Sequence, residues 1–299
     1  MTVLTDISTM QIRVDPAAFM SLGREIISHP GRRNRLGELR AFRSHFGTVP
    51  VRCCLIWNML RACDEARAIL NGALPKHLLW ALMFLKLYGT EATLCGKAKC
   101  DEKTFRKWSW KFVQAIALLL HRVVVFDRRF LGANGHRHTM SIDGTDCRIN
   151  EPTPFDRKWY SHKFRSAGVR YEIGVALRRS EIVWVNGPFP CGRNPDLVIF
   201  RNGLKARLRA GERVLADKGY RGEAGCVDIP RDQDPANLRR WKARIASRHE
   251  TVNKRLKNFN VLVVPFRHNL RKHRSVFHAV TVVTQVNLTN GDPLFDVMV

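Results

Sequence analysis

The chain has 299 residues, of which 45% are hydrophobic, and this is enough for a packed core in one large or two modest domains. It carries 51 Lys and Arg against 26 Asp and Glu, a formal net charge of +25. Such an excess opposes compaction by self-repulsion and indicates a polyanionic partner. A basic tail on a neutral protein is excluded, because residues 1–138 have 22 Lys and Arg against 10 acids and residues 139–299 have 29 against 16.

The eight cysteines form no CxxC pair, so we interpret them as reduced, mostly buried thiols of an intracellular protein. The paired spacings of structural zinc sites are absent, which argues against a zinc site at Cys95 and Cys100. The most apolar run, Leu78–Leu85, is too short to span a bilayer. We therefore expect a soluble protein with no membrane partner.

The first half of the chain is predicted to be helical. A weakly patterned segment up to residue 35 ends in the basic cluster Gly31–Arg35. Two short helices follow at Leu36–Phe46 and Val51–Leu60, with Gly47 between them and Thr48 as the expected N-cap of the second.

Residues 77–120 have the pattern of a helix-turn-helix. An apolar helix, His77–Tyr88, is followed by a short helix at Glu91–Lys97, a tight connection and a helix to about Leu120 that Asp101 caps. The expected buried stripe of that last helix is Phe105, Trp108 and Phe112. Its predicted DNA contacts are Lys103, Arg106, Lys107 and Lys111. A plain helical bundle with a solvated charged face explains this stretch equally well.

After Arg137 the periodicity changes from helical to alternating, and we place a domain boundary near residue 138. Strands are predicted at Thr139–Ile149, Tyr171–Leu177, Ile182–Val185, Arg213–Ala216 and Cys226–Ile229. Helices are predicted at Asp196–Leu208, Ala236–Asn258 and Ser275–Leu288. The turn Arg178–Glu181 makes the second and third strands part of an antiparallel meander. The second half is therefore predicted to be a mixed α/β layer fold.

The helix Ala236–Asn258 is strongly basic and has one buried stripe, formed by Ile245, His249, Val252 and Leu256. Glu250 is the single acidic residue between Asp234 and Asp292, and it lies one residue off that stripe. The position of this single carboxylate beside the packed face of a basic helix suggests a specific role for Glu250.

Three carboxylates share a setting that indicates this role. Asp143 lies on the first strand, opposite Met140 and Ile142, while Asp217 ends the short strand at 213–216. Together with Glu250 they indicate hard divalent metals with oxygen ligands, and two ions about 4 Å apart would activate water for phosphodiester displacement. The plainer interpretation stays open, because aspartates at strand ends are often turn or cap residues and Glu250 has Lys254 as an i+4 partner.

Six segments of the second half together resemble the DDE transposase nuclease domain of the PIF/Harbinger and IS5 type. They are DGTDC at 143–147, KWYSHKF at 158–164, YEIGVA at 171–176, IVWVNGPFPCG at 182–192, ADKGYRG at 216–222 and SRHETVNKRLKNF at 247–259. The resemblance runs in order from about Thr139 to Phe295, and residues 1–138 resemble the helical DNA-binding region of the family more loosely.

The resemblance implies a ribonuclease-H-like fold for residues 139–299, with a mixed sheet flanked by helices. It implies that Asp143, Asp217 and Glu250 bind catalytic Mg²⁺ or Mn²⁺, as two ions. It also implies that water cuts at transposon ends and that the freed 3′ hydroxyl attacks target DNA. The expected partners are double-stranded DNA, further copies of the chain and, as in some eukaryotic relatives, a Myb-like protein. The expected location is the nucleus in a eukaryote and the cytoplasm otherwise.

Residues around the three carboxylates are predicted to hold DNA phosphates, with a solvated basic face as the alternative for each. They are Lys158, Lys163, Arg248, Asn253, Lys254 and Lys257. His249 lies on the buried stripe, so we interpret it as a core histidine and not a general base. Trp159 is expected to be partly in the core. Asp146 is either a supporting group of the site or a strand-end residue.

Three functions are consistent with these features. The first is an active transposase, which the complete set of three carboxylates favours. The second is a transposase-derived protein that binds DNA without cutting it, for which the charge and the helix-turn-helix suffice. The third is a metal-dependent repair nuclease that cuts without strand transfer.

Overall fold

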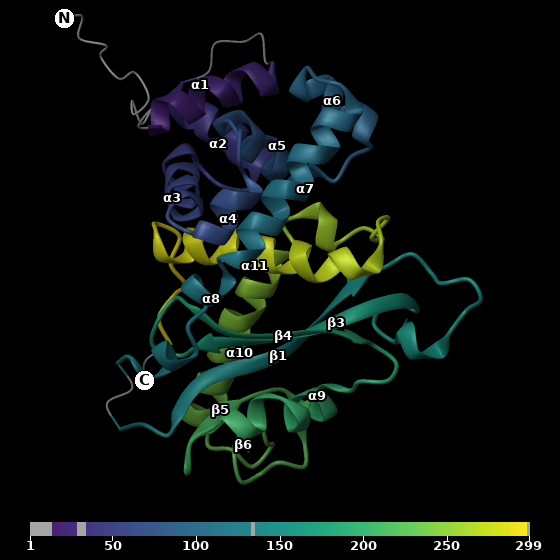
Figure 1. The fold of residues 1–299 in the computed structure, drawn as a ribbon. Coiled ribbons are helices and arrows are strands. Elements are labelled where there is room, and N and C mark those ends of the chain that lie inside the picture. The colour runs from purple at the N-terminus through teal and green to yellow at the C-terminus, as the bar shows by residue number, and fades with distance from the viewer. Residues whose placement is uncertain (1–13, 29–33, 133–134, 298–299) are drawn as a thin grey trace, which may run out of the picture.

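A computed structural model describes residues 14–28, 34–132 and 135–297. The first half of the chain is helical, and its helices occupy the upper part of Figure 1. Their bounds are α1 (Pro16–Ile27), α2 (Arg35–Phe46), α3 (Pro50–Arg61), α4 (Asp64–Ile69), α5 (Pro75–Leu87), α6 (Glu91–Ala98), α7 (Glu102–Leu118) and α8 (Leu120–Val123). The predicted helices of this half are confirmed, whereas α1, α4 and α8 were not predicted. Most of the basic cluster at 31–35 lies outside the described residues.

The caps of these helices follow local chemistry in one case and tertiary contacts in another. The carboxylate of Asp101 accepts a hydrogen bond from the Thr104 amide at 2.8 Å, as expected for the N-cap of α7. The predicted cap of α3 is wrong, because Val49 is its N-cap. Thr48 is instead fully buried, and its hydroxyl donates to Asn287 of the last helix at 2.6 Å. A tertiary contact therefore uses the side chain that the local pattern assigned to the cap.

Six strands of the described residues form one mixed sheet. Their bounds are β1 (His138–Arg148), β2 (Tyr160–Ser161), β3 (Ser166–Ala176), β4 (Ile182–Pro190), β5 (Arg213–Leu215) and β6 (Val227–Asp228). β3 pairs antiparallel with β1 on one side and with β2 and β4 on the other. β1 pairs parallel with β5, and β5 pairs parallel with β6. The predicted strands and the antiparallel meander are confirmed, while β2 was not predicted and β4 runs further than expected.

Three helices belong to this half: α9 (Asp196–Asn202), α10 (Ala236–Leu256) and α11 (His273–Thr289). Helix α9 is shorter than predicted. It ends before Gly203, where a Cβ would lie 2.5 Å from the Asn186 side chain, and a 3-10 turn at Leu204–Arg207 follows. The close packing of this segment on β4 thus interrupts the helix that its sequence predicts. The mixed α/β class is confirmed.

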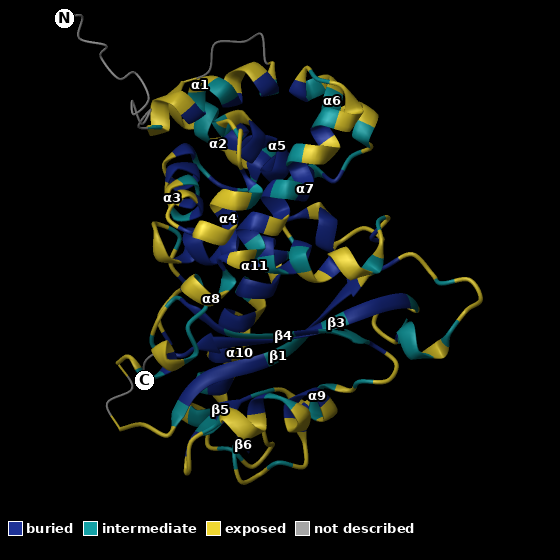
Figure 2. Ribbon diagram, viewed as in Figure 1, coloured by how far each residue is buried: buried dark blue, intermediate teal, exposed yellow. Residues whose placement is uncertain are grey.

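The two faces of the sheet pack against different partners. On one face, Met140 and Ile142 of β1 pack with Phe200 of α9. On the other face, the ring of Tyr171 stacks on Phe277 of α11 with ring centroids 3.6 Å apart. Figure 1 shows α11 between the N-terminal helices and the strands, and Figure 2 shows α5, β1 and β3 as buried. One hydrophobic core therefore extends across residue 138, and the domain boundary there stays a prediction.

Five of the cysteines are buried and three are half-buried, and all eight are free, as predicted for reduced thiols. In the described part of the chain, no helix combines the length and the apolar character that crossing a membrane requires.

Candidate active site

The register of β1 and β5 brings the two aspartates together. Ser141 of β1 lies opposite Leu215 of β5 in a parallel pair. Two residues further along the chain are Asp143, in the middle of β1, and Asp217, just beyond the end of β5, and neighbouring strands of a sheet lie about 4.8 Å apart. The parallel pairing therefore brings both carboxylates to the cleft between the sheet and α10. Asp217 is then held by its own turn, because its carboxylate accepts from the Gly219 amide at 2.8 Å.

Helix α10 is fixed on β1 by two hydrogen bonds. The Ser141 hydroxyl lies 2.8 Å from Nδ1 of His249, and Nδ2 of Asn253 donates to Asp143 at 2.9 Å. Two residues of strand advance about 6.7 Å and four residues of helix advance about 6 Å, so the two bonds run in step along both elements. This docking fixes the rotation of α10 about its axis, and with it the direction of Glu250.

The three carboxylates line one cleft of about 370 Å³ between the sheet and α10. Asp143 and Asp217 come from the sheet side, and Glu250 and Ser247 come from the helix side. Asp217 and Glu250 are exposed, while Asp143 is half-buried. The structure therefore brings the three residues predicted as catalytic to one cavity from three separate elements.

The cleft disfavours negative charge. Burial, and then the neighbouring carboxylates of Asp217 and Asp196, raise the pKa of Asp143 to about 6, against the smaller opposing effects of the Gly144 amide and the Asn253 side chain. Within the described residues, Asp143, Asp217 and Glu250 form no ion pair with Lys or Arg. A bound cation would lower the pKa of Asp143 again, because a positive charge stabilises the ionised carboxylate.

Asp196 is a carboxylate of this region that the sequence interpretation missed. It begins α9, and its buried Oδ1 accepts no hydrogen bond but forms an ion pair with Nη1 of Arg170 at 3.4 Å. A Cβ placed on Gly144 would lie 2.0 Å from this carboxylate, so residue 144 must be glycine for α9 to pack as it does. In the sequence, Pro195–Asp196 before an apolar run has the pattern of an ordinary helix start. Only the packing of α9 on β1 shows that Asp196 is also a carboxylate close to the active site.

The donor set of the cleft fits a hard divalent cation. Carboxylate oxygens from Asp143, Asp217 and Glu250 are the ligand type that Mg²⁺ and Mn²⁺ prefer, and no thiol or imidazole nitrogen competes among these three side chains. In the described residues, no group of three or more His, Cys, Asp and Glu is already gathered as a metal cage. Glu250 stands across the cleft from the two aspartates, so the fit rests on donor chemistry and the raised pKa of Asp143.

Two of the predicted DNA contacts are corrected by the structure. The Arg248 side chain is buried, and its guanidinium donates to the carbonyl oxygens of Ala176, Arg179 and Phe295. It anchors α10 to the chain around it and does not face DNA. Asn253 is also buried, and its amide holds Asp143. Its role is to orient a carboxylate of the site.

The other predicted DNA contacts stay predictions. On α7, Lys103 and Lys107 are exposed, while Arg106 donates to Glu91 at 2.8 Å and is thus paired within the fold. Lys111 is half-buried, with its ammonium 5.1 Å from the Trp108 ring. Elsewhere, Lys163 and Lys254 are exposed and Lys257 is half-buried, and Lys158 forms an ion pair with Asp156 at 2.6 Å. Phe105 and Phe112 are buried as expected, but Trp108 is only half-buried.

His249, Trp159 and Asp146 have structural roles that agree with the sequence-based expectations. His249 is 3% exposed, and burial lowers its pKa to about 3, so it is a neutral core histidine. Trp159 packs partly buried against the main core. Asp146 is buried and accepts hydrogen bonds from Arg170 at 2.7 Å and Ser161 at 2.6 Å. Asp146 therefore links β1 to β3 through Arg170 and to β2 through Ser161.

Residues 142–285 match the family model of the DDE superfamily endonuclease. The matched segment contains all three carboxylates of the cleft. The match supports a DDE endonuclease domain in this part of the chain, and with it an enzyme of the nuclease or transposase class that acts on DNA. No curated protein and no solved structure matches the chain.

Proposed function

We propose that this protein is a metal-dependent DNA transposase of the PIF/Harbinger or IS5 type. It cuts phosphodiester bonds at transposon ends and joins the 3′ hydroxyl to target DNA. The observation that carries the proposal is the meeting of Asp143, Asp217 and Glu250 at one cleft of a chain with a net charge of +25. The endonuclease match over residues 142–285 supports the hydrolytic part, and the motif resemblance supports the finer assignment.

Each residue of the cleft has a defined task in this proposal. Asp143, Asp217 and Glu250 hold Mg²⁺ or Mn²⁺, as two ions, which supply Lewis acidity for the attack of water or a 3′ hydroxyl on phosphorus. Asn253 and the Gly219 amide fix the orientations of Asp143 and Asp217 through the hydrogen bonds described above. His249 is uncharged and engaged with Ser141, so it takes no part as a general base.

The wider architecture is part of the same proposal. A ribonuclease-H-like fold for residues 139–299 is supported by the strand arrangement, in which β1 pairs antiparallel with β3 and parallel with β5. Residues 1–138 act as the DNA-binding region, with α6 and α7 as the helix-turn-helix near 77–120. The protein works as a homo-oligomer on double-stranded DNA, in the nucleus of a eukaryote or the cytoplasm of a prokaryote, with a Myb-like partner where the host provides one.

The decisive experiment is a cleavage assay on duplex DNA that carries the inverted repeats flanking the gene, in the presence of Mg²⁺. Wild type should nick the repeat ends and yield joined strand-transfer products, whereas Glu250→Gln should yield neither. Glu25→Gln removes an exposed carboxylate of α1 and should leave both products unchanged. Equal cutting by wild type and Glu250→Gln refutes the site.

The same assay separates the two other functions. Cutting without joined products identifies a nuclease that lacks strand transfer. Binding without cutting, equal with and without Mg²⁺, identifies a protein that has kept only the DNA-binding function.

A further inference from the structure

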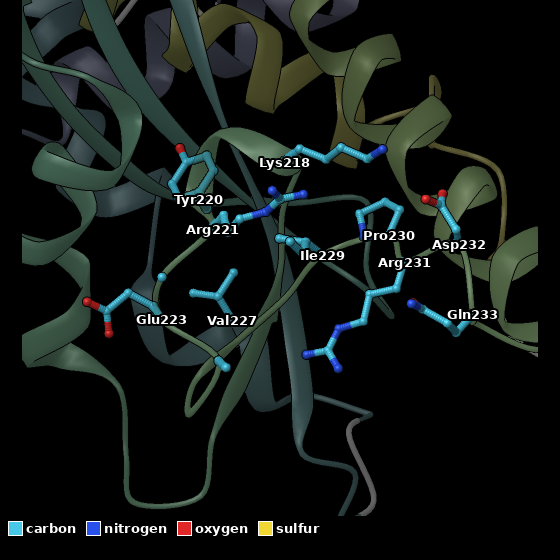
Figure 3. Close-up of a pocket in the computed structure, with 12 residues that line it drawn as sticks. Lys218, Tyr220, Arg221, Glu223, Val227, Ile229, Pro230, Arg231, Asp232 and Gln233 are labelled. Carbon is cyan, nitrogen blue, oxygen red and sulfur yellow. The ribbon is translucent and has the colours of Figure 1, made fainter.

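A second pocket, of about 350 Å³, lies directly beside the carboxylate cleft (Figure 3). Pro230 lines both cavities, and Lys218, which lines the second, follows Asp217 in the chain. Arg221 and Arg231 also line this pocket, together with the apolar side chains of Val227 and Ile229. The pocket therefore combines three cations with an apolar floor at the mouth of the site.

These three cations are not neutralised by the fold. In the described residues, Lys218, Arg221 and Arg231 form no side-chain ion pair, although other cations nearby do. Arg201 and Lys205 pair with Glu223 at 2.6 and 2.8 Å. Figure 3 shows the carboxylate of Glu223 pointing away from both pocket arginines. Asp232 also lines the pocket and forms no ion pair in the described residues. Because Glu223 is already paired with Arg201 and Lys205, the three cations face one further carboxylate, and the net charge of the pocket is positive.

Both walls of the pocket are anchored to the active site. The turn that carries Lys218 and Arg221 is fixed by the hydrogen bond from the Gly219 amide to Asp217 and by the buried ring of Tyr220. The opposite wall carries Arg231. It is held by the buried Lys242 of α10, whose ammonium donates to the Ile229 carbonyl at 2.9 Å and to Asp234 at 2.8 Å. The Asp217 turn thus forms one wall of the pocket, and α10, which lines the cleft, holds the segment that forms the other wall.

We propose that this pocket binds a backbone phosphate of the DNA strand whose neighbouring phosphodiester enters the carboxylate cleft. The identity of the ligand rests on the proposed function. Guanidinium groups match phosphate oxygens in charge and in fork geometry, and an ammonium adds a third donor. Cations here also offset the repulsion between the cleft carboxylates and the strand. The shared wall favours a DNA strand over a free anion, because a continuous polyanion can place one phosphate in the pocket and the next in the cleft.

The test is the salt dependence of DNA binding, measured by fluorescence anisotropy on a labelled duplex in chelator, where no metal is present and nothing is cut. The variant is Arg221→Gln/Arg231→Gln, and the matched control is Arg207→Gln, an exposed cation of the 3-10 turn Leu204–Arg207 with no ion pair in the described structure. Each lost phosphate contact lowers the slope of log Kd against log salt concentration by about 0.9. We expect the double variant to lose about two from the slope and to bind roughly tenfold more weakly.

Further variants make the result specific. Lys218→Gln should lower the slope by about one, and Arg221→Lys should keep the slope because it keeps the charge. Thermal unfolding of each variant identifies a folding defect, and if the double variant is unfolded the single variants decide. A wild-type slope in folded Arg221→Gln/Arg231→Gln, or an equal loss in Arg207→Gln, overturns the pocket assignment.

The binding experiment and the cleavage assay can refute the phosphate pocket and the proposed function independently of each other. Because binding is measured without metal, a lowered slope stands even if wild type and Glu250→Gln cut DNA equally. Conversely, an active nuclease with an unchanged slope in the double variant leaves the carboxylate site intact and refutes the phosphate pocket alone.

Discussion

Two groups of carboxylates, on the sheet or close beside it, differ in their partners. In the first group each acid accepts hydrogen bonds from an arginine: Glu212 from Arg129 at 2.7 Å, Asp146 from Arg170 at 2.7 Å and Asp228 from Arg213 at 2.8 Å. The second group is Asp143, Asp217 and Glu250. In the described residues, the hydrogen-bond donors to this group are the Asn253 side-chain amide and the Gly219 backbone N–H. The chain has 51 Lys and Arg, so a shortage of cations does not explain why these three acids lack one.

We interpret the difference as one between acids that hold the fold together and acids that bind metal in the proposed function. Hydrogen bonds from Arg213 lower the pKa of Asp228, so its charge is favoured in the fold. Burial and nearby acids raise the pKa of Asp143 to about 6, so its charge is disfavoured. A folded protein tolerates such a cost mainly at functional sites. The predictions below test whether the two groups behave in opposite ways.

The largest expected effect is on catalysis. Asp217→Asn and Glu250→Gln should each lower the cleavage rate by about 10³-fold or more, because each removes a carboxylate that would hold the metal ions. DNA affinity measured in chelator and the unfolding temperature should change little, since both side chains are exposed. Gel-based cleavage kinetics provide the measurement. An activity loss that tracks unfolding would place these residues with the structural acids.

The next effect is on stability and concerns the first group. Arg129→Met should lower the free energy of unfolding by about 3 kcal/mol, because it leaves Glu212 buried and charged without its main partner. Urea unfolding gives the value. Arg137→Met, at an exposed arginine beside β1, is the matched control and should change little. Adding Glu212→Gln to Arg129→Met should restore part of the loss, and a further loss would contradict the ion-pair explanation.

Asp143→Asn should instead stabilise the metal-free protein. A pKa raised to about 6 means that the contribution of Asp143 is fully present at low pH and is lost as pH rises through that value. At about pH 8 the variant should therefore be more stable by about 2 kcal/mol, and the gain should fade toward about pH 4.

The neighbouring Asp146 is expected to respond to the same substitution with the opposite change in stability. Asp146→Asn should be destabilising at neutral pH, because Arg170 loses a charged partner. Millimolar Mg²⁺ should raise the unfolding temperature of wild type but not of Asp143→Asn, since a ligand of the folded state alone stabilises it. The same sign for both asparagine variants would remove the distinction between the two groups.

The smallest effect concerns the glycine between Asp143 and α9. Gly144→Ala should cost about 1–3 kcal/mol, because its Cβ would meet the Asp196 carboxylate at 2.0 Å and α9 would have to shift. Gly96→Ala is the control, since no atom lies within 4 Å of its added Cβ and alanine favours the helix there. Denaturant unfolding of both variants decides. A neutral Gly144→Ala would show that Asp196 moves freely.

Much of the fold could be predicted because it depends on local periodicity. Alternation identified β1, β3 and β4, and the spacing of Ile245, His249, Val252 and Leu256 identified the packed face of α10, all four of which are buried. These patterns are local because side chains alternate along a strand and recur every 3.6 residues along a helix. The three carboxylates of the cleft were also predicted, through their strand-end and helix-face positions together with the family motifs.

The tertiary structure alone decided what lies against each face. Periodicity places Arg248 and Asn253 around the axis of α10, but it does not show that Arg248 meets the carbonyls of Ala176 and Phe295 or that Asn253 meets Asp143. The same holds for Asp196 against Gly144. A side chain in a helix has a direction that the sequence determines, whereas its partner comes from a distant segment. The sequence by itself therefore predicted most of the elements and the three acids, and the packing of those elements decided which acids have no cationic partner.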